Sequence, residues 1–512
     1  MPQAATVSEN NKRIAKNTLM LYVKMAFTIS LGIFATRVLL QALGADDYGL
    51  VTVIGGVVTM FAFLSSTMWQ ACSRFFSFEL GQKNKDSLKQ TFNLTQLIYL
   101  GLAVILFVLL ETVGLWFLEN KVVIPPERAD AAFWFFQFSV GTFLLGILSI
   151  PYVALISSHE NVKAFASIAI FEAAGRLGII YLISLSSFDR LAFYGALLSV
   201  VGIFHFLINY LVCRLKYPES RFAFFWDKRR FIELLSFGGW NLWGAMSGLF
   251  TNVFINVLLN NYFGPAVNAA RGIAVQLSAA ITAFTTNFMT AVNPQIIKYY
   301  ASGDIHQSHL LAMRASRVGF FLLFFFALPA WLLMPFVLGL WLEEVPAHTV
   351  WFTRLILVQL LVDVLSYPLT TLAQASGRIA LFQSVIGVVL WSTLPLAWML
   401  LKFFFVPPES VACVAIAVSC ICFGLRLVLV RRCAQLSIRI FLRKTLFPVC
   451  LAASVSMAVP VWLTFSIISS PSWSQVLVVG SSSVLSTIIA VMFLGVSFEE
   501  RLFLIRFIRT KI

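Results

Sequence analysis

The chain has 512 residues, of which 60% are hydrophobic and only 12% are charged, whereas an ordinary soluble protein has about 25% charged residues. Fifty phenylalanines and thirteen tryptophans are too many for one soluble core. The composition excludes a cytosolic enzyme, a disordered protein and a single-pass receptor. An outer-membrane barrel is also excluded, because the apolar runs are nearly continuous and do not alternate with period two. These features predict an all-α polytopic membrane protein.

A helix needs about 20 apolar residues to cross the hydrocarbon core. By that rule the sequence predicts fourteen transmembrane helices. The second and the eighth are the most polar, with many Ser, Thr, Asn and Gly residues. The predicted spans are 17–42, 49–78, 93–118, 131–156, 163–185, 191–213, 232–259, 267–295, 315–342, 350–373, 379–402, 409–430, 445–468 and 475–497.

The distribution of basic residues predicts the orientation. The formal net charge is +15, and membrane proteins keep Lys and Arg in cytoplasmic loops. If the N-terminus is cytoplasmic, the loops that fall outside keep only Lys121, Arg128, Arg190 and Lys402, and the inside loops hold all the other basic residues that lie outside the spans. The first apolar run is too long for a signal peptide and has no A-x-A exit, so we expect it to remain as the first span. Both ends are therefore predicted to be cytoplasmic in a bacterial inner membrane.

The spans suggest two six-helix bundles with two additional helices at the C-terminal end. A weak internal repeat supports this division, because LGADDYGLVTVIGGV (43–57) and FGPAVNAARGIAVQL (263–277) both begin with a predicted outside turn that leads into a glycine-containing span. Parallel repeats of this sort are typical of transporters with a central site. The predicted parts are a cytoplasmic tail (1–16), the first bundle (17–213), a basic linker (214–231), the second bundle (232–430), a basic loop with two helices (431–497) and a basic tail (498–512).

Seven basic residues fall within the predicted spans, where each costs roughly 2.5–3.5 kcal/mol to insert. Glu172 and Arg176 are four residues apart and are expected to pair. Arg74 and Arg426 lie near cytoplasmic ends and are candidates for snorkelling. Asp363 is the acid to test as a proton or sodium carrier. The basic residues in the spans are Lys24, Arg37, Arg74, Arg176, Arg271, Arg354 and Arg426.

Polar stripes accompany some of these cations. Asn241, Asn252 and Asn256 share a face of the seventh predicted span, and Arg271 and Asn293 share a face of the eighth. Such stripes are either seams of interhelical hydrogen bonds or walls of a wet cavity, and an arginine without a nearby acid favours the cavity. Arginine donates paired hydrogen bonds to phosphate. The pattern favours an amphipathic anionic ligand over a sugar, an amino acid or a metal ion.

Other chemistry is weakly represented. None of the seven cysteines lies in a predicted outside loop, so we expect no disulfide framework. His306 and His309 are three residues apart without a third ligand nearby, and we expect no metal site. No P-loop or other ATP-binding motif is present. We therefore expect no cofactor, and we attribute the positive charge to membrane orientation rather than to nucleic-acid binding.

Three segments resemble the bacterial polysaccharide-biosynthesis flippases of the superfamily of multidrug, oligosaccharidyl-lipid and polysaccharide exporters, which also includes the MATE drug exporters. The likeness covers roughly 12–90 and 236–304. It rests on RIAKNTLMLYVKMAFTISLGIFATRVLLQALGADDYGLVTVIGGVV, SRFFSFELG and FGPAVNAARGIAVQLSAAITAFTTNFMTAVNPQIIKYYASGD.

The resemblance implies a twelve-helix, two-lobed core around a cavity that opens alternately to each leaflet, with two further helices. It also implies a flippase for polyprenyl-diphosphate-linked oligosaccharide of the O-antigen (lipopolysaccharide) type, with membrane lipids and polysaccharide-assembly proteins as candidate partners. By position, Lys24, Arg37 and Arg271 become the main candidates for substrate binding, and Arg74 and Arg354 follow. Two alternatives stay open: a cation-coupled MATE-type multidrug exporter, and a polytopic ligase or polymerase for the same glycolipids. The ligase is disfavoured because no predicted outside loop is long.

Overall fold

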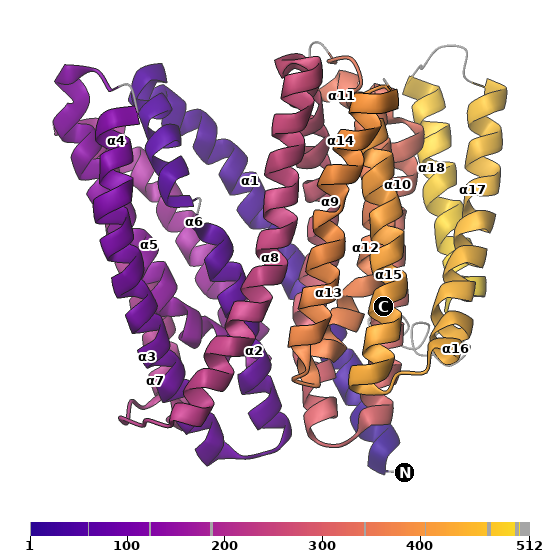
Figure 1. Ribbon diagram of the computed structural model, residues 1–512, viewed down its shortest axis with the longest axis horizontal. Helices are drawn as coiled ribbons and strands as arrows, with labels where there is room; N and C mark the ends of the chain where they lie inside the picture. The colour runs from indigo at the N-terminus through magenta and orange to yellow at the C-terminus, as the bar shows by residue number, and fades with distance from the viewer. Residues whose placement is uncertain are drawn as a thin grey trace. The chain divides into compact units, whose positions relative to one another are not determined.

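The structure is a computed structural model that describes residues 2–59, 61–121, 124–184, 188–342, 345–404, 406–467, 473–496 and 501. Within these residues all regular structure is helical. The chain divides into two compact units, Met1–Ala245 and Met246–Ile512. Figure 1 shows the helices in chain order.

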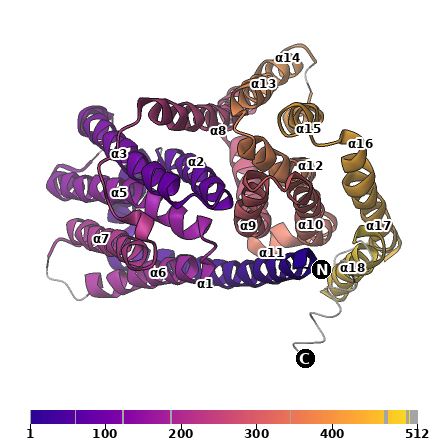
Figure 2. The same ribbon diagram turned by 90° about the horizontal axis from the view of Figure 1, so that it is seen from below.

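The first unit is organised around α5 (Ala129–Ser158), which packs against α1, α2, α3 and α7. Figure 2 shows these helices gathered in one bundle, with α1 seen along its length. Helices α5 and α7 pack closely, with Gly195 lying against Phe135. The other helices of this unit are α1 (Pro2–Thr59), α2 (Ala62–Gly81), α3 (Lys85–Leu109), a π-helical turn (Leu110–Gly114), α4 (Leu115–Lys121), α6 (Val162–Ser184), α7 (Arg190–Lys216) and the first part of α8 (Lys228–Phe263).

The second unit is organised around α12 (Thr349–Ala375), which packs against α9, α10 and α15. The paired helices α17 and α18 pack on α10 through a cluster that includes Phe321 and Val479. The remaining helices are α9 (Pro265–Ala301), α10 (Ile305–Leu332), α11 (Met334–Trp341), α13 (Ile379–Trp391), α14 (Thr393–Phe404), α15 (Ser410–Ala434), α16 (Ile438–Phe441), α17 (Phe447–Ile467) and α18 (Trp473–Ala490), with π-helical turns at Leu442–Leu446 and Val491–Gly495.

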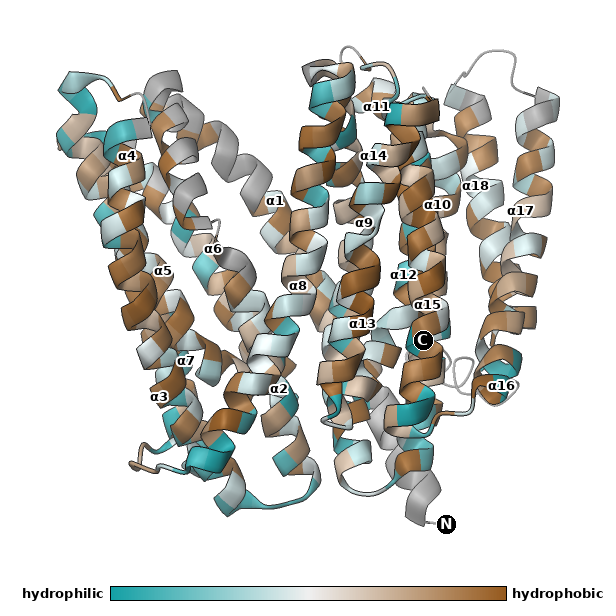
Figure 3. Ribbon diagram, in the orientation of Figure 1, coloured by the Kyte–Doolittle hydropathy of each residue, from teal (hydrophilic) through white to brown (hydrophobic). Residues whose placement is uncertain are grey.

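Eleven helical segments in the described part of the chain are long and apolar enough to cross a membrane. The chain is thus a multi-pass membrane protein, but the predicted count of fourteen is not confirmed. The three predicted spans that are missing are the first, the second and the eighth. The eighth corresponds to α9, which has 37 residues and is long enough but carries many Ser, Thr and Asn side chains. Figure 3 shows hydrophilic colour interrupting the brown helices mainly at their ends.

The predicted turn at 43–48 is absent, because α1 is helical from Pro2 to Thr59. The other half of the sequence repeat does break, since Gly264 has φ +83° and α9 begins with Pro265. Pro265 cannot continue the hydrogen bonding of α8, whereas Ala45 stands at the equivalent position and is a strong helix former. The two halves of this weak sequence repeat therefore differ in backbone structure.

The ends of the first unit agree with the predicted alternation of loops. At one end, Arg128 binds both Asp47 and Asp189, and all three residues come from predicted outside segments. At the other end, His159 binds Glu219 at 2.6 Å, and both come from predicted inside segments. These contacts show that the segments predicted to share a side lie together. Which end faces the cytoplasm remains a prediction from charge.

Candidate functional site

The second unit contains a buried arginine held by two neutral amides. Arg271 is the seventh residue of α9, which begins at Pro265 directly after the break at Gly264. Its Nη2 donates to Asn252 Oδ1 at 2.8 Å, and its Nη1 donates to Asn256 Oδ1. Asn252 and Asn256 are one turn apart on α8, so both face the same neighbour. The structure therefore brings together three of the predicted site residues.

The charge of Arg271 has no acidic partner. Among the described residues no carboxylate lies within ion-pair distance of its guanidinium, and the side chain is only 9% exposed. A guanidinium has five N–H donors. The two amides take one donor on each terminal nitrogen, which leaves N–H groups without a partner in the described part of the chain. This arrangement is suited to an additional anionic acceptor.

The predicted residues further along the second unit have different partners. Asn293 accepts a hydrogen bond from Thr371 at 3.0 Å, which links α9 to α12. Arg354 donates its Nε–H to the carbonyl of Trp331 at 2.9 Å and lies over the rings of Trp331 and Trp351, at 4.9 and 5.3 Å. Its position thus depends on the chain around it. Arg354 therefore has a structural contact within the second unit, and its predicted role in substrate binding stays a prediction.

A proline explains why Arg354 is needed there. In a continuous helix the carbonyl of Trp331 accepts from the N–H of residue 335, but residue 335 is proline and has no N–H. The helix ends at Leu332 and restarts as α11 at Met334. Arg354 supplies the hydrogen-bond donor that Pro335 lacks.

Asp363 is paired rather than isolated. Its Oδ1 lies 4.0 Å from Nη1 of Arg426, which joins α12 to α15. Gln359 donates to its other oxygen at 3.5 Å. Arg426 was predicted to snorkel towards the cytoplasm, but it reaches this carboxylate instead. A coupling cation at Asp363 would have to compete with a resident arginine.

In the first unit the predicted cations contact aromatic rings. Lys24 Nζ lies 4.7 Å from the ring centre of Phe165 on α6, and the charge of Glu172 on the same helix attracts it. Arg74 is buried, with its guanidinium carbon 4.5 Å from the ring of Phe75 and 5.0 Å from those of Phe78 and Phe237. These are cation–π distances. Both cations are thus partly satisfied within this unit.

Two further residues of the first unit were predicted for the site, Asn241 and Arg37. Asn241 donates to the carbonyl of Phe237 in its own helix at 3.0 Å. The Arg37 side chain lies outside the described residues. Glu172 binds Arg176 at 2.9 Å, which confirms the predicted pair. Glu172 also lies 3.1 Å from His205 on α7, and this contact was missed because 33 residues separate the two and no sequence pattern links them.

A second polar cluster lies at the predicted inner end of the first unit, outside the spans. The His159 ring stacks on Tyr217 with 4.1 Å between centres, and Asn161 donates to the Tyr217 hydroxyl at 3.0 Å. Burial alone would raise the pKa of Glu219, but hydrogen bonds from His159 and from the backbone outweigh it and lower that pKa. Arg13 of α1 also binds Glu160 beside this cluster, at 2.9 Å. The cluster ties α1 and two inner segments together.

No group of three or more metal-ligating side chains is present in the parts of the chain that the structure describes. His309, one half of the His306/His309 pair, instead contacts the carbonyl of Ala434 at 2.8 Å. All seven cysteines are free.

The fold is that of a multi-pass helical membrane protein, and comparison with solved structures shows which known folds it is similar to. No protein-family model matches the sequence, and no curated protein is similar to it. The structural neighbours are transporters of the MATE type within the MOP superfamily. At these low identities the likeness concerns the fold alone.

Three neighbours illustrate the match. A MATE P26A mutant has a TM-score of 0.72 at 12% identity, with 83% of this chain and 96% of that chain covered. A MOP superfamily transporter from Pyrococcus furiosus, described as having a binding pocket of reverse polarity, has a TM-score of 0.69 at 12% identity with the same coverage. The MATE transporter ClbM in complex with Rb+ has a TM-score of 0.65 at 16% identity, with 84% and 96% covered.

Proposed function

We propose that this chain is a flippase that moves polyprenyl-diphosphate-linked oligosaccharide from the inner to the outer leaflet of a bacterial inner membrane by alternating access. The observation that carries the proposal is the Arg271 clamp, which we define as Arg271 with Asn252 and Asn256. The diphosphate binds at this clamp, the glycan occupies polar space and the polyprenyl tail stays in lipid. The proposal includes no covalent step.

The energetics of the clamp support an anionic substrate. An arginine within a membrane span costs roughly 2.5–3.5 kcal/mol, and two neutral amides orient it without cancelling its charge. A purely structural arginine is better served by a carboxylate or a freed carbonyl, as Arg426 and Arg354 are. A phosphate that accepts from the remaining N–H groups forms charge-assisted hydrogen bonds. With the cytoplasm negative, each net negative charge moved outward gains roughly 2.3 kcal/mol per 100 mV.

A second candidate function is a cation-coupled multidrug exporter. The observation that favours it is the fold, because one structural neighbour is an outward-facing multidrug resistance MATE family transporter with a TM-score of 0.69. A cationic drug is poorly matched to the Arg271 clamp. Of the acids within the spans, Glu172 and Asp363 are each engaged by an arginine, whereas Glu111 accepts a hydrogen bond from Gln137 at 3.0 Å.

The test uses a deletion strain complemented with variants of the full chain. We expect Arg271→Ala to abolish surface polysaccharide and to trap lipid-linked oligosaccharide on the inner leaflet. Asn256→Asp is the more specific test of the charge of Arg271, because it keeps the side-chain shape and gives Arg271 an acidic partner. It should preserve protein level and lower flipping as strongly as Arg271→Ala.

The control is Arg439→Ala, which removes an exposed arginine on α16 and should leave the glycan normal. If Asn256→Asp flips at the normal rate, the phosphate-binding role of Arg271 is refuted. If the deletion leaves surface glycan intact but sensitises cells to cationic drugs, the exporter is the better assignment.

A further inference from the structure

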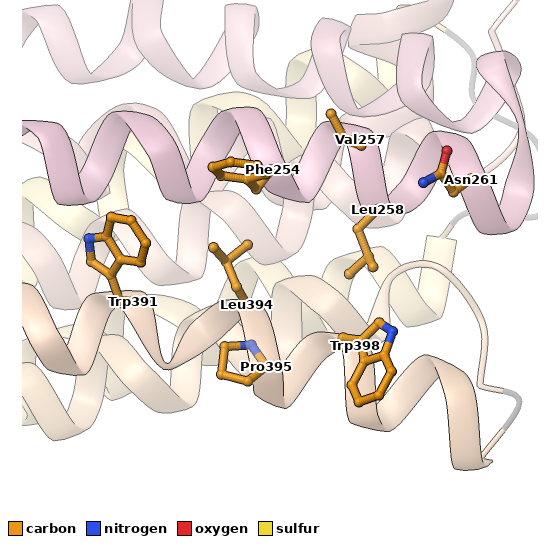
Figure 4. Close-up of a pocket in the computed structure, with 8 residues that line it drawn as sticks. All are labelled: Phe254, Val257, Leu258, Asn261, Trp391, Leu394, Pro395 and Trp398. Atoms are coloured by element: carbon orange, nitrogen blue, oxygen red, sulfur yellow. The ribbon is translucent and has the colours of Figure 1, made fainter.

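The second unit has an apolar groove on the α8–α14 side that the transport proposal does not use. The groove has a volume of about 490 Å³, which lies within the range of small-molecule sites. Figure 4 shows Phe254 and Leu258 of α8 pointing across it towards Leu394 and Trp398. The lining residues are Phe254, Val257, Leu258, Asn261, Trp391, Leu394, Pro395 and Trp398, so that Asn261 is the polar member.

A helix break shapes one wall. Pro395 has no N–H, so the carbonyl of Trp391 loses its helical partner, and α13 ends at Trp391 while α14 begins at Thr393. On the buried side of the same seam, Leu259 of α8 packs in one cluster with Ala397 of α14. The groove therefore lies on the outer side of this contact, where Phe254, Val257 and Trp398 are exposed.

The groove is separate from the Arg271 clamp. At 100° per residue, Asn252 and Asn256 lie within about 40° of each other on one side of α8. Phe254 lies about 160° from both of them, and Leu258 lies about 120° from Asn252 and about 160° from Asn256. The groove and the clamp thus use different faces of one helix. An occupant of the groove need not be the transported molecule.

A lysine marks one end of the groove. Lys402 Nζ lies 4.5 Å from the ring centre of Trp398, a lining residue, and 5.7 Å from that of Phe403. No carboxylate pairs with Lys402 within the described chain. It is also the single basic residue that the predicted outside loops of the second unit retain. An exposed cation beside a tryptophan is typical of the membrane–water interface.

We propose that this groove binds an anionic phospholipid of the outer leaflet, with one acyl chain along the apolar wall and the phosphate at Lys402 and Asn261. From Phe254 to Asn261 the α8 wall is about 10 Å long at 1.5 Å per residue, which fits within one leaflet of a hydrocarbon core about 30 Å thick. The positive charge lies at the end where a headgroup resides. The site would make the transporter sensitive to the lipid composition of the membrane, whatever it transports.

The test is native mass spectrometry of the full-length protein in detergent, titrated with phosphatidylglycerol and with phosphatidylcholine of identical chains. We expect tighter binding of phosphatidylglycerol. Lys402→Gln should weaken that binding about fivefold, the loss of one lysine–headgroup attraction, and leave phosphatidylcholine unchanged. Leu394→Trp fills the groove and should weaken both lipids, whereas Leu396→Trp, on an exposed side chain of the same helix outside the groove, should weaken neither.

Equal binding of the two lipids to the unmodified protein would overturn the proposal, as would full phosphatidylglycerol binding by Lys402→Gln. A third arm adds a polyprenyl phosphate as competitor. Displacement of phosphatidylglycerol by a lower concentration of the polyprenyl phosphate would also overturn the assignment, because the site would then select the isoprenoid chain. If Leu394→Trp fails to fold, the Lys402→Gln comparison still decides.

Discussion

The hydrogen bond from Arg354 to the carbonyl of Trp331 gives a quantitative prediction, because its cause is a specific proline. Arg354→Met removes the Nε donor that reaches Trp331 at 2.9 Å, together with the contacts to two indole rings. An unpaired carbonyl costs about 1–3 kcal/mol, and each lost cation–π contact costs about 0.5–1 kcal/mol where it is exposed. Removing a charge from the span offsets part of this. We expect a net loss of about 2 kcal/mol in the free energy of unfolding.

The double-mutant cycle uses Pro335→Ala, which restores an N–H at the position that a helix would use to satisfy Trp331. In that background Arg354→Met should cost at least about 1 kcal/mol less, which is a coupling typical of residues that share one partner. The assay is equilibrium unfolding of the full chain in mixed micelles. Arg439→Met is the matched control and should leave stability unchanged.

The same cost of Arg354→Met in both backgrounds would refute the reasoning, since the bond to the freed carbonyl would then not be what Arg354 contributes. A stabilising effect of Arg354→Met alone would refute it more directly. In that case the arginine would be retained for a reason other than the fold.

Three further predictions concern other contacts. Gly195→Ala places a Cβ 3.0 Å from a ring carbon of Phe135 on α5 and 3.2 Å from the backbone of that residue. The unfolding midpoint should therefore fall by the equivalent of about 1–3 kcal/mol. The control is Gly141→Ala, which has open space around it and should have an unfolding midpoint equal to or above that of the parent. Asp363→Asn strips Arg426 of its carboxylate and should cost up to about 3 kcal/mol, with part recovered in Asp363→Asn/Arg426→Met; no recovery would show that the two residues act independently. Because the pKa of Glu219 is below its ordinary 4.5, its stabilisation is present above pH 4.5 and is lost as the pH falls through the lower folded value. Glu219→Gln should flatten the unfolding midpoint across that acid range, and an unchanged slope would contradict the contact.

Much of the fold followed from hydropathy alone. Long apolar runs, separated by loops that are alternately rich and poor in basic residues, predicted the spans from α3 to α8 and from α10 to α18, because lipid imposes a similar length on each. They did not predict the breaks between α10 and α11 and between α13 and α14. The failure at 43–48 has a local cause. A glycine suggested a turn, but only the second copy of the repeat adds the proline that forces one.

The candidate site was predictable where it depended on one helix and its neighbour. Asn252 and Asn256 share a face by helical spacing, and Arg271 begins the next helix, so their meeting needed little tertiary information. The pairing of Asp363 with Arg426 depends on how α12 lies against α15, which spacing does not specify. The sequence contained one indication of the role of Arg354, because Pro335 leaves the carbonyl of Trp331 without its helical donor. Which residue replaces that donor became clear only when the structure placed α12 beside the break after α10.

The neutral amides around Arg271 have a consequence for any reconstitution of the protein. A carboxylate beside an arginine neutralises its charge, but asparagines only accept its hydrogen bonds. The charge of Arg271 can therefore be neutralised only by an anion from the solution or by a substrate. If chloride or buffer phosphate binds there, an anionic substrate has to displace it. We therefore expect apparent affinity for an anionic substrate to fall as the salt concentration rises, so that the choice of electrolyte becomes a variable of the transport assay in its own right.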